Sequence, residues 1–226
     1  MASFATSSLA AGQHLITAVY GGDAIFGGST SSVVTQTVNQ ASTTTALASN
    51  SSTSTYGQSV TFTATVSPSN ATGTVQFFDG SASLGNATLS GGSASLSTSS
   101  LSAGTHSITA RYNGDSNYSG STSPVLSQTV NKANTTTTLT SNRNPSNSGQ
   151  TVTFTATVSP STATGTVRFF DGSTLLGTAA LSGGKASLST SSLSTGSHSI
   201  TAQYSGNGNY NGSTSAVLTQ SVRTKR

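Results

Sequence analysis

Gly104-Thr-His-Ser-Ile-Thr-Ala-Arg-Tyr112 is the stretch that decides the fold, because it occurs three times in the chain. The other copies are Gly12-Gln-His-Leu-Ile-Thr-Ala-Val-Tyr20 and Gly196-Ser-His-Ser-Ile-Thr-Ala-Gln-Tyr204, and each copy begins 92 residues after the previous one. A fixed period of this length predicts an array of similar structural units. In 226 residues it leaves two complete units and the back portion of a third.

Within a unit, apolar and polar residues alternate in short runs. Residues 60–66, Val-Thr-Phe-Thr-Ala-Thr-Val, place four apolar side chains on one face and three threonines on the other, and residues 152–158 repeat this run. Alternation of this kind is the period of a half-buried strand. The predicted strands of the first complete unit are Thr43–Ala48, Ser59–Val66, Thr74–Phe78, Ala82–Leu89, Ala94–Ser99, Gly104–Tyr112 and Val125–Val130. Seven short strands separated by turn signals predict an all-β, two-sheet sandwich with almost no helix.

The repeat also sets the predicted domain boundaries. Residues 1–39 are an incomplete C-terminal part of a unit, residues 40–131 and 132–223 are complete units, and residues 224–226 are a basic tail. The junctions, Val38-Asn39-Gln40-Ala41 and Val130-Asn131-Lys132-Ala133, contain no Gly/Ser linker run. Because a short junction without such a run leaves little freedom, we expect neighbouring units to be restrained in angle.

Composition excludes several classes of function. The net charge is +4, but three of the eight basic residues lie in the last four positions and no basic patch is interleaved with aromatics, so no nucleic-acid partner is expected. Cysteine is absent, which excludes disulfides, thiolate metal sites and cysteine nucleophiles. Glutamate is absent too, which removes most glycosidase carboxylate pairs. No apolar run is long enough to span a bilayer, so we expect no membrane insertion.

The residues resemble a known family, the group 3 bacterial Ig-like domain repeats. The motifs that carry the resemblance are Gly57-Gln-Ser-Val-Thr-Phe-Thr-Ala-Thr-Val-Ser-Pro68, Gly73-Thr-Val-Gln-Phe-Phe-Asp-Gly80 and Leu101-Ser-Ala-Gly-Thr-His-Ser-Ile-Thr-Ala-Arg-Tyr112. The resemblance covers essentially the whole chain and implies tandem Ig-like β-sandwiches. Such modules are typically serial spacers in large secreted or surface proteins, and some belong to adhesins. It therefore implies an extracellular or cell-surface location.

The three histidines, His14, His106 and His198, occupy one register of the repeat, after Leu-x-x-Gly. Ig-like sandwiches often carry a tyrosine corner near this place, and an imidazole N–H could make the same local bond. Because every unit has this histidine, we interpret all three as structural corners. Asp79 lies at the same end of the sandwich as His106, and Asp171 does so for His198. A functional Asp–His dyad is the alternative interpretation.

The loop after the sixth strand varies most between units and is the candidate ligand site. Loops at the ends of sandwiches often bind ligands. The residues that would form the site are Asp115, Asn117, Tyr118, Asn207, Asn209 and Tyr210. A shared calcium site is not expected, because Asp115 becomes Asn207 and hard cations prefer carboxylates. The aromatic residue of this loop is expected to pack back onto the end of the sandwich.

Residues 1–39 lack the strands that would complete their sandwich. The inward side chains, taken as Phe4, Leu15 or Ile16, Val19, and Val33 or Val34, would be partly bare beside open strand edges. We expect this segment to be the least stable part of the chain, or to seek a partner strand in trans. Its first residues match Ser93–Gly104 and resemble no signal peptide, so the expected explanations are a truncated gene, a misassigned start or a piece of a longer protein.

These observations favour a structural function. The units are predicted to be spacer or stalk modules of a secreted or cell-surface bacterial protein, whose partners are neighbouring modules of the parent chain. The alternative is an adhesin-type module that binds a surface glycan or protein through the loops after the sixth strand. No enzyme activity, catalytic residue, cofactor or metal site is predicted.

Overall fold

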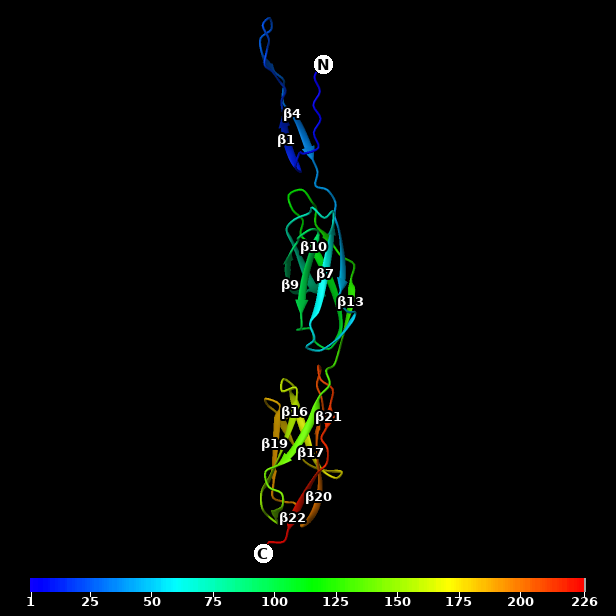
Figure 1. Cartoon of the computed structure of the whole chain (residues 1–226), viewed down its shortest axis with the longest axis vertical. Helices are drawn as coiled ribbons and strands as arrows, with labels where there is room; N and C mark the ends of the chain where they lie inside the picture. Colours follow the sequence, from blue (N-terminus) through cyan, green and yellow to red (C-terminus); the bar gives the residue numbers. More distant parts are fainter. Residues whose placement is uncertain (226) are drawn as a thin grey trace. The chain divides into compact units, whose positions relative to one another are not determined.

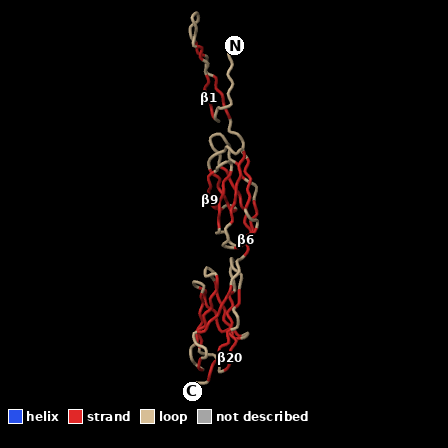
Figure 2. Tube along the Cα trace, viewed as in Figure 1, coloured by secondary structure: helices blue, strands red, loops and turns tan. Residues whose placement is uncertain are grey.

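The computed structural model describes residues 1–225, and Arg226 of the predicted basic tail lies outside the described residues. Strands and loops make up the whole described chain, and no helix occurs among residues 1–225 (Figures 1 and 2). The chain is therefore all-β and is built from tandem Ig-like sandwiches, as the alternating residues predict.

The middle repeat consists of two sheets. One sheet has the strand order β10-β7-β5, and the other has the order β6-β13-β11-β8-β9 with β12 paired to β11. The strands are β5 (Thr44–Ser49), β6 (Thr53–Thr55), β7 (Val60–Ser67), β8 (Thr74–Asp79), β9 (Ala82–Thr88), β10 (Ser93–Thr98), β11 (Gly104–Tyr112), β12 (Ser121–Thr122) and β13 (Leu126–Asn131).

The last repeat has the same topology. Its sheets have the orders β14-β16-β19 and β15-β22-β20-β17-β18, with β21 paired to β20. The strands are β14 (Thr136–Ser141), β15 (Ser146–Asn147), β16 (Val152–Ser159), β17 (Gly165–Asp171), β18 (Thr174–Leu181), β19 (Lys185–Thr190), β20 (Gly196–Tyr204), β21 (Ser213–Thr214) and β22 (Leu218–Arg223).

The core of each sandwich is made by the alternate apolar side chains. All four apolar side chains of residues 60–66 in β7 are at most 2% exposed, and Phe77 of β8 is fully buried. Ile108 and Tyr112 of β11 are also fully buried. Each buried Val, Ile or Phe side chain among them contributes about 1.5–3 kcal/mol by leaving water. The apolar period of the sequence therefore corresponds to the inner faces of the two sheets.

Two short strands of each repeat are absent from the sequence prediction. β6 pairs in parallel with β13 through Thr53↔Thr129, and β12 pairs with β11 through only two residues. Both segments consist of serine and threonine, so they carry no apolar alternation that a period could detect. The seven predicted strands are all present, and no end is shifted by more than one residue.

Residues 1–39 form only a narrow part of a sandwich. β1 (Gly12–Ile16) pairs with β4 (Val34–Val38), and β2 (Val19–Tyr20) pairs with β3 (Ser29–Thr30). One part of the prediction is wrong: Val19 is not an inward residue. Its counterpart Arg111 is exposed, whereas the next residue, Tyr112, is buried. Tyr20 is therefore the inward residue of β2, and by the same register Ile16 rather than Leu15 is inward in β1.

The described chain divides into two compact units that do not follow the repeat boundaries. The first unit comprises Met1–Ser52, Ser59–Thr98 and Thr105–Gln128, and the second comprises Thr53–Gln58, Ser99–Gly104 and Thr129–Arg226. Three short segments of the middle repeat, residues 53–58, 99–104 and 129–131, are thus grouped with the last repeat. The boundaries 40–131 and 132–223 stay a prediction from the sequence period.

Candidate functional site

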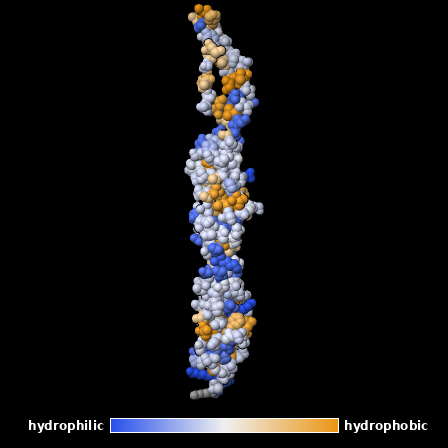
Figure 3. Space-filling view, turned by 90° about the vertical axis from the view of Figure 1, so that its right-hand side faces the viewer, coloured by the Kyte–Doolittle hydropathy of each residue, from blue (hydrophilic) through white to orange (hydrophobic). Residues whose placement is uncertain are grey.

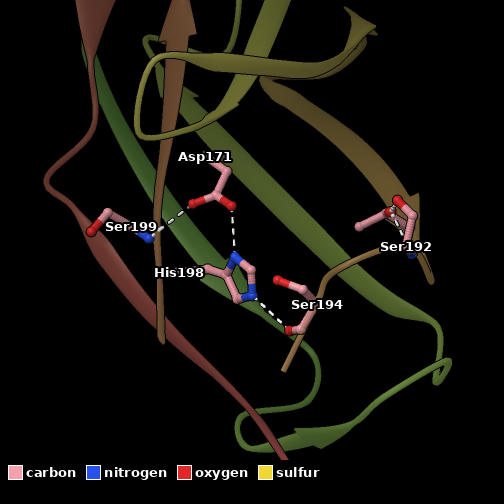
Figure 4. Close-up of polar contacts among 6 residues, drawn as sticks. Asp171, Ser192, Ser194, His198 and Ser199 are labelled. Carbon is pink, nitrogen blue, oxygen red and sulfur yellow. Dashed lines mark hydrogen bonds and ion pairs between the residues drawn. The ribbon is translucent and has the colours of Figure 1, made fainter. Parts of the chain in front are cut away.

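The histidine of the last repeat has a polar partner for each ring nitrogen. His198 lies in β20, which pairs with β17 in the register Asp171↔Ile200. Its Nδ1 is 2.6 Å from Oδ2 of Asp171, and its Nε2 is 2.8 Å from the carbonyl oxygen of Ser194 (Figure 4). The other carboxylate oxygen of Asp171 accepts the backbone N–H of Ser199 at 3.1 Å. These contacts join the beginning of β20 to the end of β17.

Both partners of the His198 ring are hydrogen-bond acceptors. A backbone carbonyl cannot donate, and an ionised carboxylate cannot donate either, so only the doubly protonated imidazolium satisfies both contacts. Consistently, the hydrogen bond to the carbonyl of Ser194 and then the contact with Asp171 raise the pKa of His198, against the opposing effect of burial. Both contacts therefore favour the protonated ring, which can donate from each nitrogen.

This geometry leaves no ring nitrogen for catalysis. A general base needs a free lone pair within reach of the proton that it takes, and both nitrogens of His198 are engaged. Among residues 1–225, no group of three or more His, Cys, Asp and Glu side chains could hold a metal ion.

The other two histidines share parts of this arrangement. Nδ1 of His106 is 2.7 Å from Oδ2 of Asp79, and Nε2 of His14 is 2.7 Å from the carbonyl oxygen of Ala10. The role of His14, His106 and His198 as structural corners stays a prediction, for which these contacts supply the geometry.

The loop after β11 is organised by the carboxylate of Asp115. Its Oδ2 accepts the N–H and the hydroxyl of Thr72, at 2.8 and 2.7 Å. Its Oδ1 accepts the N–H groups of Asn117 and Tyr118 at 2.8 and 2.9 Å. The contacts from Thr72 come first among the causes that lower the pKa of Asp115 to about 2. Four donors converge on this carboxylate, so it braces the loop rather than presenting free oxygens to a cation.

Asn207 organises the equivalent loop of the last repeat, but its amide nitrogen donates where the Asp115 carboxylate accepts. Its Oδ1 accepts the N–H groups of Asn209 and Tyr210, at 2.8 and 2.9 Å. Its Nδ2 donates to the carbonyl and to the hydroxyl oxygen of Thr164, each at 3.1 Å. The threonine therefore donates to Asp115 in one repeat and accepts from Asn207 in the other. The replacement of Asp by Asn preserves the loop because the threonine can serve both partners.

The two loop tyrosines differ in exposure. Tyr210 is only 6% exposed, its hydroxyl is 2.6 Å from the hydroxyl of Thr162, and its ring meets that of Tyr56 edge to face at 5.3 Å within the second compact unit. Tyr118 is half-buried. The expectation that this aromatic packs back onto the end of the sandwich is consistent with the contact between Tyr210 and Thr162, although the ring of Tyr210 also meets Tyr56 of the middle repeat. The partner Thr72 could have been found from its recurrence as Thr164, whereas Tyr56 has no aromatic counterpart and carries no such signal.

Asn117 and Asn209 each accept a hydrogen bond from a residue of the preceding repeat. That residue lies just before the strand that carries the histidine, β1 or β11. Oδ1 of Asn117 accepts the N–H of Ala11 at 2.9 Å within the first unit, and Oδ1 of Asn209 accepts the N–H of Ala103 at 2.8 Å within the second. The two contacts are related by the 92-residue period. All six residues of the predicted ligand site therefore lie in these two loops, but most of their polar atoms are occupied by the chain itself.

The residues that follow each junction are hydrogen-bonded to the same loops. Ala41 N–H donates to the carbonyl of Asn117 at 2.8 Å, and the Ala41 carbonyl accepts the N–H of Ser119 at 2.9 Å. Ala133 repeats both bonds with Asn209 and Asn211, each at 2.9 Å. Each predicted junction thus passes directly from a strand into a hydrogen-bonded segment.

Comparison with protein families decides what kind of repeat this is. The model of the bacterial Ig-like domain (group 3) matches residues 1–39, 47–131 and 139–223. The chain belongs to this family. Group 3 Ig-like domains are typically parts of surface or secreted proteins and are typically non-catalytic. No curated protein matches this group 3 Ig-like chain.

Several solved structures resemble the group 3 Ig-like chain in fold. The fibronectin(III)-like modules of Clostridium thermocellum CbhA are 17% identical, with 79% of this chain and 94% of that chain covered and a TM-score of 0.34. The adhesin InvE of Yersinia pseudotuberculosis is 15% identical, with coverages of 77% and 58% and a TM-score of 0.42. The human OSCAR ligand-binding domain is 16% identical, with coverages of 77% and 97% and a TM-score of 0.34. Likenesses of this size carry nothing about function.

Within the described part of the group 3 Ig-like chain, no helix has the length and apolar character needed to cross a membrane.

Proposed function

We propose that this chain is a spacer segment of a bacterial surface or secreted protein. Its repeats provide length and perform no catalysis. The observation that carries the proposal is that the residues which follow each junction are hydrogen-bonded to the next sandwich. Asn131 is the last residue of β13, and Lys132 Nζ donates to the carbonyl of Asn207 at 2.8 Å. Ala133 is hydrogen-bonded through both its N–H and its carbonyl.

The first junction supports the same interpretation. β4 ends at Val38, Gln40 Nε2 donates to the carbonyl of Asp115 at 2.7 Å, and Ala41 is bonded to the loop after β11. Freedom between modules comes from linker residues whose backbone is unconstrained. A junction whose residues are hydrogen-bonded to the following sandwich has few residues with an unconstrained backbone. We therefore expect the angle between successive modules to be fixed. Membership of a family typical of surface and secreted proteins supports an extracellular location.

Distances between paired labels test this proposal. The chain has no cysteine, so the exposed, equivalent serines of β10 and β19 can be labelled through Ser95→Cys and Ser187→Cys. Pulsed electron paramagnetic resonance is expected to give one narrow distance distribution. Insertion of Gly-Gly-Ser-Ser between Asn131 and Lys132 is the matched control and should broaden it severalfold. A parent chain with a distribution as broad as that of the insertion variant would contradict a spacer of fixed angle.

The alternative function, binding of a surface glycan or protein, centres on one loop. Of the two described loop tyrosines only Tyr118 keeps part of its ring exposed. Aromatic side chains are enriched at interfaces between proteins. A glycan array with the parent chain and with Tyr118→Ala tests this version, and Tyr210→Phe is the control because Tyr210 is buried. Glycan binding that Tyr118→Ala leaves unchanged, or no binding to the array at all, would contradict glycan binding through this loop.

A further inference from the structure

The outer face of the larger sheet carries the same polar pair in both complete repeats. In the middle repeat Gln76 of β8 lies opposite Arg111 of β11, and in the last repeat Arg168 of β17 lies opposite Gln203 of β20. The two residue types have exchanged strands, yet each repeat keeps a guanidinium and an amide about 5 Å apart at Cβ. Both arginines are exposed. What the two repeats share is therefore the pair, and not the residue at one position.

An aromatic side chain lies beside this pair on the same face. Phe78 is opposite Thr109 in the middle repeat, and Phe170 is opposite Thr201 in the last repeat. Phe78 is half-buried, whereas the preceding Phe77 belongs to the core and is fully buried. Because side chains alternate along a strand, Phe78 shares the outer face with the Gln–Arg pair. Each complete repeat thus presents a guanidinium, an amide, a hydroxyl and part of an aromatic ring on adjacent strands.

A hollow opens beside the arginine of the middle repeat. It has a volume of about 470 Å³, and the residues that line it are Arg111, Tyr112, Asn113, Gly120, Ser121 and Thr122. Thr122 belongs to β12 and lies directly opposite Arg111. Sites for small ligands have volumes of about 300–1,000 Å³, so the hollow has room for a sugar residue. Most of the lining side chains are polar, which suits a ligand with hydroxyl groups.

The free side-chain charge of the chain is positive. Eight Lys and Arg residues face four acidic residues, and hydrogen bonds already engage every one of these carboxylates. Asp23 and Asp115 brace loops, whereas Asp79 and Asp171 accept from a histidine and a backbone N–H. Both ion pairs among residues 1–225 join a histidine to an aspartate, so no carboxylate in this range neutralises the arginines of the outer face. The surface drawn in Figure 3 is mostly pale, with separate patches of strongly hydrophilic blue. A partner that complements such a surface is anionic.

We propose that the outer face of β8 and β11, and its counterpart on β17 and β20, binds a polysaccharide whose sugars carry carboxylate groups. The guanidinium would hold the sugar carboxylate in the bidentate geometry that arginine favours. The phenylalanine ring would cover the apolar face of the sugar, and the glutamine and threonine side chains would bond to its hydroxyl groups. The site is a sheet face and not the loop after β11, and the proposal does not depend on the spacer role.

Two other interpretations of the pair fit the contacts less well. A cross-strand pair stabilises a sheet through contact between its own side chains, but the Gln76 amide donates to Ser83 at 3.4 Å, and no hydrogen bond joins it to Arg111 in the described part of the chain. Nucleic-acid binding relies on several phosphate contacts, whereas this face offers a single guanidinium in each complete repeat. A sugar carboxylate needs only one such group, with polar and aromatic neighbours that match the rest of the sugar.

The test follows the backbone amide signals of the full chain by NMR during titration with tetragalacturonate. Signals of β8 and β11 and of β17 and β20 are expected to shift, with a Kd on the order of millimolar at each site because the ion pair is exposed to water. Added salt should weaken binding, since it screens exposed charges. The methyl ester of the same sugar has no charge and should bind at least about tenfold more weakly. Equal binding of the ester, shifts confined to other strands, or no shift at about 10 mM sugar would overturn the proposal.

The two repeats supply matched variants for each other. Arg111→Gln introduces the residue type that Gln203 provides at the equivalent place, so the fold should tolerate it. It should weaken binding at β8 and β11 at least about tenfold and leave the shifts of β17 and β20 unchanged, which makes the last repeat an internal control. Gln76→Arg combined with Arg111→Gln copies the arrangement of the last repeat and should restore the Kd to within about threefold of the parent value.

A charge control separates this site from general attraction between opposite charges. Lys185→Gln removes a positive charge from β19, which belongs to the other sheet, and should leave the Kd unchanged. The proposal would be overturned if Lys185→Gln weakened binding as much as Arg111→Gln, or if Arg111→Gln had no effect. Failure of the combined exchange to restore binding, or equal shifts with a single-stranded oligonucleotide, would also overturn it.

Discussion

Residues 12–38 and residues 104–130 carry nearly the same motifs, yet one set is exposed and the other is the core of a sandwich. Ile16 and Tyr20 are nearly half exposed, whereas Ile108 and Tyr112 are fully buried. The local pairing is shared: β1 pairs with β4 as β11 pairs with β13, and β2 pairs with β3 as β11 pairs with β12. The comparison shows that a motif can specify a strand and its facing direction without specifying burial. Burial requires the strands that come earlier in the repeat.

Polar groups respond to the missing strands differently from apolar ones. Tyr20 finds a local acceptor in Asp23 in place of the backbone carbonyl that Tyr112 uses. Hydrogen bonds can be re-formed with a neighbour or with water, so the polar loss is small. Apolar side chains have no such substitute, and Ile16 stays in contact with water. The four predictions below break or sharpen this comparison, beginning with the largest expected effect.

The largest difference is expected in amide exchange. Two-stranded ladders are marginal in water, whereas a closed sandwich exchanges only by opening. Amides of β1 and β4 should therefore exchange at least on the order of 1,000-fold faster than those of β11 and β13. Exchange measured by NMR in the full chain provides the comparison. Equal protection of the two regions in a monomer would show that residues 1–39 close in some other way.

The next largest difference is expected in the loss of stability when the isoleucine shared by the two regions is truncated. Ile108→Ala removes a fully buried side chain and is expected to lower the free energy of unfolding of the middle repeat by about 2–5 kcal/mol. Ile16→Ala removes a half-exposed one and should change stability by less than about 0.5 kcal/mol. Urea denaturation followed by residue-resolved NMR measures both. Similar effects of the two substitutions would contradict the assignment of burial.

The contribution of His198 to the stability of the last repeat should depend on pH. The contacts with Ser194 and Asp171 raise the pKa of His198 in the folded state, so its contribution is fully present below its ordinary pKa of about 6.5 and is lost as pH rises through the raised value. His198→Gln should therefore cost on the order of 1 kcal/mol at about pH 5.5 and less at about pH 9.

The matched control for this prediction is His14→Gln, since His14 has no aspartate partner of this kind within residues 1–39. Its effect on residues 1–39 should be smaller, because the contact of the ring with the Ala10 carbonyl is not accompanied by one with an aspartate of residues 1–39. Urea denaturation at both pH values supplies the measurement. A His198→Gln effect that stays constant from about pH 5.5 to about pH 9 would exclude the doubly hydrogen-bonded imidazolium.

The smallest expected effect concerns the two equivalent loops, in which Asp115 of the middle repeat corresponds to Asn207 of the last repeat. The Thr72 contacts lower the pKa of Asp115 to about 2, so its stabilising contribution is present above its ordinary pKa of about 3.8 and is lost as pH falls toward 2. Melting temperatures between about pH 5 and about pH 2 should show this loss in the middle repeat. Asp115→Asn should remove it, and Asn207→Asp should introduce it into the last repeat. Unchanged acid profiles in both variants would show that the carboxylate does not brace the loop.

Much of the fold could be predicted because it depends on short periods. Alternation over residues 60–66 predicts a strand and its inner face, and the spacing of His106 from its copies predicts the repeat. Serine and threonine segments such as β6 carry no such period, so their pairing could not be predicted. The inward residue of β2 follows from alignment with Gly104–Tyr112, in which Arg111 is exposed and Tyr112 is buried, so Val19 was assigned to the wrong face.

The candidate site was less predictable than the fold. The six loop residues were found because the loop varies between repeats, but their hydrogen-bond partners lie far away in the chain. Thr72 is 43 positions from Asp115, and Ala103 is 106 positions from Asn209. Whether a carboxylate is free for a ligand or filled by donors depends on such distant groups. Periodicity within the loop contains no information about them.

By itself the sequence determined the all-β class, the 92-residue unit, the facing direction of the long strands and the place of the three histidines, because each follows from chain-local sterics and from alternating side chains. Only the tertiary structure decided that Ile16 is exposed while Ile108 is buried, that both nitrogens of His198 are engaged, and that four donors surround Asp115. These properties arise where strands distant along the chain meet. Burial and hydrogen-bond saturation therefore depend on which partner segments are present, and not on the residue that is buried or bonded.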